Sequence, residues 1–229
     1  MDIIPQASLF LGIIPALFLL FISLKGYEGL YKEKNIFLTF VVGIVLGFIA
    51  AFVQSVTFAL AIIYIILLAF FDQLIKTIIL NLGRFHKKKE TVIYGMSLGL
   101  GFGSSFTPFL IIAVSSIITN DVYVLTLIAI GSLGIILFHG ATGAYIGYGI
   151  YVGKLIKHLL YVIIFQLPFN FILGMMIAYS DAETLDVQFV FVASLIIYGT
   201  VVFCYVIKNI MPKIIQKSKR RIKKRKKGF

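Results

Sequence analysis

The sequence is poor in charged side chains and in cysteine. Only 13 % of its 229 residues are Asp, Glu, Lys or Arg, whereas a soluble domain carries roughly 25 %. So few charges cannot cover a water-facing surface, and lipid must therefore be the solvent for much of the chain. The single cysteine, Cys204, excludes an intrachain disulfide and a cysteine-rich metal framework. Its apolar neighbours are typical of a cysteine that packs as a small hydrophobe.

Long apolar segments take the place of the missing charges. A membrane-spanning helix needs about 20 mostly apolar residues. Seven segments meet this requirement, near 8–24, 36–53, 58–82, 92–117, 122–150, 155–179 and 188–210. The first has no Lys or Arg before it and no small-residue cleavage site after it, which favours a retained span over a signal peptide. The sequence predicts an all-α, seven-span membrane bundle over residues 1–210 and a polybasic tail over 211–229.

Basic residues are unevenly divided between alternate connections, and this division predicts an orientation. Of the 21 Lys and Arg residues, 20 fall in the segments 25–34, 84–89, 154–157 and 208–227, and the remaining one is Lys76. The other connections hold acidic residues and no Lys or Arg: Asp2, Asp121, Asp181, Glu183 and Asp186. Short basic loops face the cytoplasm. We therefore expect a multi-pass protein of the cell membrane with its N-terminus outside and its C-terminus inside.

The tail is the most polar part of the sequence. Nine of the eleven residues from position 217 to 227 are basic: Lys217, Lys219, Arg220, Arg221, Lys223, Lys224, Arg225, Lys226 and Lys227. We favour adhesion to anionic lipid headgroups, which contributes about 1 kcal/mol per basic residue near a membrane surface. Docking on RNA or the ribosome and binding of a protein partner are alternatives. The tail lacks interleaved aromatic residues for base stacking, which disfavours RNA.

Few strongly polar residues lie inside the predicted spans, where an unpaired charge costs several kcal/mol. Asp72 and Lys76 are one turn apart on the third span and can pair. His139 lies in the fifth span, and Gln166 and Asn170 lie four residues apart in the sixth. At the helical rise, Asp72, His139 and Gln166 all lie about 15–16 Å from the inner boundary. The common depth predicts one buried polar site.

A purely structural interpretation is the alternative. In that case Asp72 and Lys76 form an intrahelical ion pair and His139 is a packing residue. Glycines four residues apart in the fourth span, at positions 95, 99 and 103, predict close helix contacts, as do those of the second and fifth spans. Pro108 and Pro168 predict kinks in the fourth and sixth spans.

These residues resemble the motifs of the PrsW family of intramembrane proteases, which is distantly related to the CAAX-protease group. On successive spans that family carries an EExxK motif, a YGxxxxxGF…ENxxY stretch, a histidine and an HGxxDF-like motif. The similar segments here are Asp72-Gln73-Leu74-Ile75-Lys76, Tyr94-Gly95 to Gly101-Phe102 with Phe106-Thr107-Pro108-Phe109-Leu110, His139, and Gln166-Leu167-Pro168-Phe169-Asn170. The order agrees from about residue 60 to 175. The resemblance implies a PrsW-like core in spans three to six.

The departures from this family pattern remove most of the titratable groups. Asp72 and Gln73 replace the paired glutamates, Phe106 replaces the glutamate of ENxxY, and Gln166 and Asn170 replace the second histidine and the acid after it. The resemblance implies peptide hydrolysis by glutamate and histidine activating a water. Gln and Asn can hydrogen-bond a carbonyl but cannot exchange protons. Asp72 and one histidine are the acid–base candidates that remain.

We therefore expect a proteolytically impaired relative that binds other transmembrane segments or proteins. The predicted cavity is lined by Asp72, Gln73, Lys76, Phe106, Thr107, His139, Gln166 and Asn170. One alternative is a working intramembrane protease that uses Asp72 and His139, and another is a small carrier or proton path, which inverted repeats would favour. No cofactor is expected. No metal is expected either, because one histidine and one aspartate supply at most two ligands, against three or four for zinc.

Overall fold

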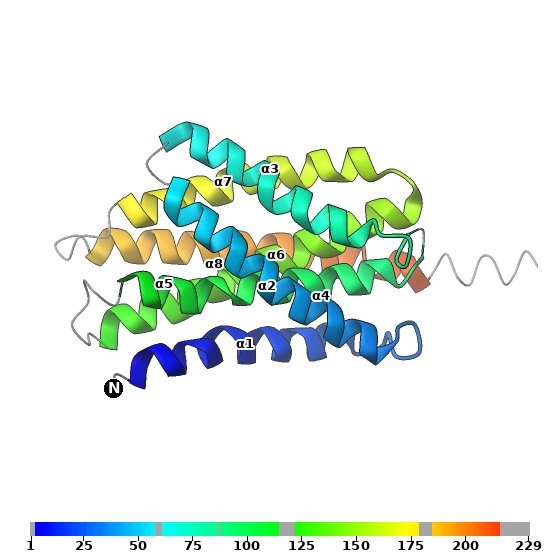
Figure 1. The fold of residues 1–229 in the computed structure, drawn as a ribbon, viewed down its shortest axis with the longest axis horizontal. Coiled ribbons are helices and arrows are strands. Elements are labelled where there is room, and N and C mark those ends of the chain that lie inside the picture. Colours follow the sequence, from blue (N-terminus) through cyan, green and yellow to red (C-terminus); the bar gives the residue numbers. More distant parts are fainter. Residues whose placement is uncertain (1–2, 58–60, 87, 115–121, 179–184, 216–229) are drawn as a thin grey trace, which may run out of the picture.

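The computed structural model describes residues 3–57, 61–86, 88–114, 122–178 and 185–215. Over these ranges the chain is helical and contains no strand. The helices lie side by side along one long axis (Figure 1). They are α1 (Ile3–Leu24), α2 (Glu33–Thr57), α3 (Ala61–Leu80), α4 (Thr91–Ser104), α5 (Phe106–Val114), α6 (Val122–Val152), α7 (Leu155–Ala178) and α8 (Leu185–Asn209).

Several of these helices have the length and composition of membrane spans. Four segments are long and apolar enough to cross a membrane, namely 33–56, 126–152, 155–176 and 186–215, and Phe10–Leu24 is a shorter apolar helix. The surface of the bundle is also apolar, since Phe21, Phe37 and Ile156 are each more than 70 % exposed. An apolar exterior fits a membrane protein, because lipid rather than water then covers these side chains.

The predicted fourth span, 92–117, is not one continuous helix. It divides into α4 and α5 at Ser105, and residues 115–117 lie outside the described ranges. Pro108 has no N–H to donate to the carbonyl of Ser104, so one helical hydrogen bond is missing at this point. The N–H of Ser105 instead donates to the carbonyl of Phe102 at 3.4 Å. Pro168, in contrast, lies within α7 and does not end it.

The other predicted spans correspond to single helices with shifted ends. The predicted third span, 58–82, corresponds to α3, and residues 58–60 lie outside the described ranges. α1, α2 and α8 begin earlier than their predicted spans, and the end of the predicted sixth span, residue 179, is not described. The turns after α1 and α6 require left-handed backbone at Gly26, Gly29 and Gly153, whose φ angles are +88°, +75° and +73°.

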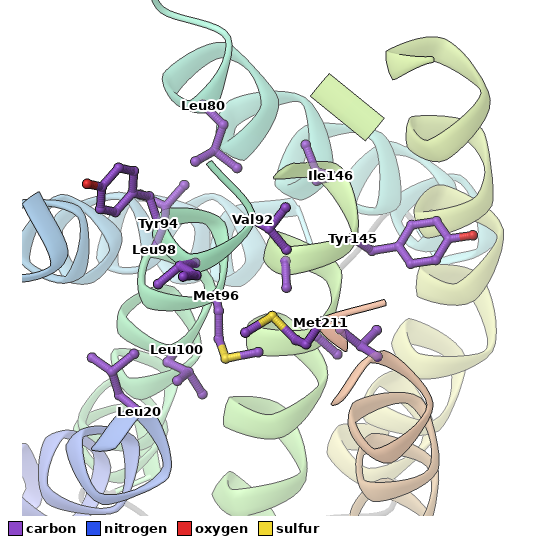
Figure 2. Close-up of a cluster of buried hydrophobic side chains, with 14 of the residues drawn as sticks. Leu20, Leu80, Val92, Tyr94, Met96, Leu98, Leu100, Tyr145, Ile146 and Met211 are labelled. Carbon is purple, nitrogen blue, oxygen red and sulfur yellow. The ribbon is translucent and has the colours of Figure 1, made fainter. Parts of the chain in front are cut away.

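The centre of the bundle is formed by α4 and α6. Every residue of α4 is buried. Contact with α6 is backbone against backbone, because a β-carbon at Gly95 would lie 2.2 Å from the carbonyl oxygen of Gly143. Gly43 and Gly47 bring α2 equally close to the other side of α4. Figure 2 shows α4 side chains meeting residues of α1, α3 and α6, together with Met211, which follows α8.

Helices run in alternating directions along the chain, except that α5 continues in the direction of α4, and this sorts the connections to two ends of the bundle (Figure 1). The connections after α1, α3 and α6 and the end of α8 lie at one end. The start of α1 and the ends of α2, α5 and α7 lie at the other. The first end therefore contains the basic segments identified in the sequence, apart from the tail beyond residue 215, which is not described.

Candidate functional site

The candidate site begins with the inward face of α3. Asp72, Gln73 and Lys76 are each at most 4 % exposed, and Thr77 is also buried. The opposite face of the helix is apolar and open: Leu67, Phe70, Leu74 and Ile78. A helix with polar residues inside and apolar residues outside is the reverse of a helix in a soluble protein. It keeps its polar groups away from hydrocarbon, where unsatisfied polar atoms are costly.

One half of the site is a chain of side-chain hydrogen bonds between α3 and α7. Gln73 Nε2 donates to Gln166 Oε1 at 2.5 Å. Gln166 Nε2 donates to Asp72 Oδ2 at 3.3 Å and to Asn170 Oδ1 at 2.7 Å. Asn170 Nδ2 then donates to the backbone carbonyl of Ile65 at 3.1 Å. Gln166 therefore makes the side-chain bonds between the two helices with Gln73 and Asp72, and Asn170 adds a bond to the backbone of α3.

The other half connects α3 to α6. Lys76 Nζ lies 3.1 Å from His139 Nδ1 and donates to Thr142 Oγ1 at 3.0 Å. The Thr142 hydroxyl in turn donates to the carbonyl of His139, which lies one helical turn earlier. Lys76 is completely buried, and His139 is 1 % exposed. With Nδ1 occupied by the lysine, His139 has one ring nitrogen, Nε2, left for any other partner.

Aromatic rings enclose His139. The ring of Phe106 stacks on it with centroids 5.4 Å apart and an angle of 17°, and Phe102 lies 4.8 Å away on a tilted plane. Phe138 and Phe169 approach at 5.6 Å and 5.9 Å. Lys76 Nζ also lies 5.0 Å from the centroid of Phe102, within the range of a cation–π contact. Position 106 is thus filled by a ring that covers the histidine.

Asp72 and Lys76, which the sequence places where they can pair, bond to other residues instead. Asp72 accepts from Gln166, and Lys76 turns toward His139 and Thr142. The two groups are close enough to interact electrostatically. The long lysine side chain has several rotatable bonds, so its ammonium group can reach in more than one direction. Whether it contacts Asp72 or the residues of α6 therefore depends on where α6 lies.

Three buried oxygen atoms of the predicted site have no hydrogen-bond partner: Asp72 Oδ1, Gln73 Oε1 and Thr107 Oγ1. The first two belong to the α3–α7 chain of hydrogen bonds. Thr107 is separate from it, since its hydroxyl lies against α1, 3.1 Å from where a β-carbon of Gly12 would be. Buried polar atoms without partners are uncommon in proteins, and they mark the place where a polar group or water would be stabilised.

Comparisons with protein-family models, curated proteins and solved structures find no match. The resemblance to the PrsW family therefore remains a prediction from the motifs. The chemistry of the site has to be argued from its own residues.

Sequence reasoning missed Thr142. The signal available was its position three residues after His139, which places both on one face of α6. The structure brings together Asp72, Gln73, Gln166 and Asn170 in one half and Lys76, Phe106 and His139 in the other. Among the described residues, no three His, Cys, Asp or Glu side chains come together as metal ligands. The basic residues 217–227 lie outside the described ranges.

Proposed function

We propose that this chain is a seven-span membrane protein on a PrsW-like scaffold, with its N-terminus outside and its basic end in the cytoplasm, that binds other transmembrane segments or proteins without cleaving them. The observation that carries this proposal is that the two acid–base candidates are bonded to different partners. Asp72 is hydrogen-bonded to Gln166, whereas His139 Nδ1 contacts Lys76. Peptide hydrolysis requires a base and a second polar group acting on the same water and carbonyl.

The surroundings of His139 support the same proposal. Phe106 covers one face of the imidazole, and Phe102 lies over it on a tilted plane. A peptide carbonyl would have to displace these rings to reach Nε2. The residues that line the other half of the site, Gln166, Gln73 and Asn170, can donate and accept hydrogen bonds but cannot move protons.

A partner of this protein is an apolar transmembrane segment. The outward faces of its helices present large apolar side chains, among them Phe70 and Ile78 on α3. Contact between helices in lipid depends on packing and on interhelical hydrogen bonds. The inner polar groups then stabilise the scaffold, and the binding surface is the lipid-facing one.

The test is to co-express the wild type, Asp72→Asn and His139→Gln with candidate single-span membrane proteins. We expect no fragment that depends on the wild type, and we expect both variants to retain co-purification of the same partners. General acid–base help contributes about 10²–10⁴-fold to a rate, so an enzyme would lose turnover in either variant. A fragment that forms with the wild type and disappears with either variant would establish the active protease instead.

A further inference from the structure

A basic cavity lies at the end of the bundle that holds the connections after α1 and α3. Its volume is about 620 Å³. Four cationic side chains line it, Lys32, Lys34, Arg84 and Lys88, against one carboxylate, Glu90. All four cationic side chains are exposed at the surface. The excess of positive charge predicts an anionic ligand.

Hydrogen bonds between the two connections hold the wall of this cavity in place. The hydroxyl of Tyr94, at the start of α4, accepts from the backbone N–H of Lys32 at 3.1 Å and from Asn35 Nδ2 at 3.2 Å. Arg84 Nη2 donates to Asn35 Oδ1 at 2.5 Å. Lys88 Nζ donates to the carbonyl of Arg84 at 2.7 Å. Because Tyr94 only accepts in these bonds, its own hydroxyl proton is available to a ligand in the cavity.

An apolar groove lies next to the basic cavity. It has a volume of about 230 Å³ and is lined by side chains of α1 and α2, including Leu17, Phe21 and Phe37. Tyr31 lines both the groove and the basic cavity, so the two lie next to each other at this residue. Burial raises the pKa of the Tyr31 hydroxyl, with Glu28 and Glu33 adding to the effect. Tyr31 is therefore a neutral hydrogen-bond donor at physiological pH.

We propose that the basic cavity and the α1–α2 groove together bind one anionic phospholipid, with its phosphate in the cavity and an acyl chain in the groove. The juxtaposition of four cations and an apolar groove matches a molecule that is charged at one end and apolar along its length. A soluble phosphate would use the cavity and leave the groove without a role. The inference rests on the membrane insertion and orientation in the proposed function, but not on the chemistry of the Asp72–His139 site.

The experiment uses the full chain in neutral detergent and measures phosphatidylglycerol binding by native mass spectrometry. Lys32→Gln combined with Lys34→Gln removes two charges from the cavity while keeping the backbone N–H that bonds Tyr94. We expect phosphatidylglycerol affinity to fall by about 30-fold, as two basic contacts at a lipid surface predict. The matched control is Lys154→Gln combined with Lys157→Gln, which removes two exposed charges, one from the connection between α6 and α7 and one from the first turn of α7. In the control we expect affinity to stay within about 3-fold.

A second pair of variants tests the acyl chain. Leu17→Trp narrows the groove, and Leu67→Trp places the same ring on the exposed outer face of α3. We expect Leu17→Trp alone to weaken phosphatidylglycerol binding, and neither variant to change the binding of inorganic phosphate. Equal losses from both charge pairs would mean nonspecific attraction and would overturn the site. Inorganic phosphate binding as tightly as the lipid, with no effect of Leu17→Trp, would assign a soluble anion instead. Neither result bears on cleavage, so the proposed function is tested separately.

Discussion

At the scale of single residues, Gln166 organises the buried polar groups. Its amide donates to Asp72 and Asn170, and its carbonyl oxygen accepts from Gln73. These bonds hold α3 and α7 together where few other polar contacts are possible. A neutral amide does this without the desolvation cost of a charge, since it offers donors and an acceptor at once.

Replacing Gln166 should therefore cost more stability than replacing its neighbour. Gln166→Met keeps the volume of the side chain but removes its hydrogen bonds to Gln73, Asp72 and Asn170. Buried polar atoms of these three residues then lose a partner, and we expect a loss of about 3 kcal/mol in the free energy of unfolding. Asn170→Leu leaves Gln166 bonded to Asp72, and we expect a loss of about 1 kcal/mol. Unfolding in detergent measures both. Equal losses would show that Gln166 is not the junction of the network.

At the scale of helices, glycine determines how close α4 comes to its neighbours. A β-carbon at Gly99 would lie 2.0 Å from the carbonyl oxygen of His139. The backbone position of the histidine is thus set by the absence of a side chain on the facing helix. Close approach of this kind is typical of helices that pack in lipid. No hydrophobic driving force acts between helices there, and small residues allow the close packing that holds them together.

An alanine at position 99 should separate α4 from α6. We expect Gly99→Ala to destabilise the protein by about 1–3 kcal/mol, because backbone atoms cannot move aside as a flexible side chain can. The control is Gly174→Ala in α7, where a β-carbon meets nothing within 4 Å. That change should stabilise the helix by about 0.5–1 kcal/mol. Thermal unfolding of both variants gives the comparison, and a stable Gly99→Ala protein would contradict the close contact.

At the scale of the whole molecule, the alternation of helix direction collects the basic connections at one end (Figure 1). The same alternation brings the loop after α1 against the start of α4, which creates the basic cavity. The positive-inside rule then predicts an orientation that does not depend on any single residue, because every connection at that end contributes to it.

Thiol labelling in intact cells tests that orientation. In a Cys204→Ser background, we expect a membrane-impermeant reagent to label Glu183→Cys and to leave His86→Cys unlabelled until the cells are opened. The physical reason is that basic connections stay in the cytoplasm while the connections without Lys or Arg cross the membrane. Labelling of a cysteine placed in the tail of intact cells would reverse the topology and, with it, the orientation on which the phospholipid proposal rests.

The sequence by itself determined that the described chain is helical and apolar, and it identified most members of the buried site. These are local properties: apolar runs form helices in lipid, and the rare polar side chains within them turn inward. The glycine spacing on α4 likewise predicted the close helix contacts that the structure contains.

Only the tertiary structure decided which of these groups meet. Lys76 has Asp72 one turn away on its own helix, yet it contacts His139 and Thr142, because the position of α6 brings their acceptors within reach. The break at Ser105 depends on a proline whose effect, a kink or a new helix, is set by the packing around it. The basic cavity joins Lys32 to Tyr94, which are far apart along the chain. No local pattern encodes such a contact, since it follows from how the helices pack.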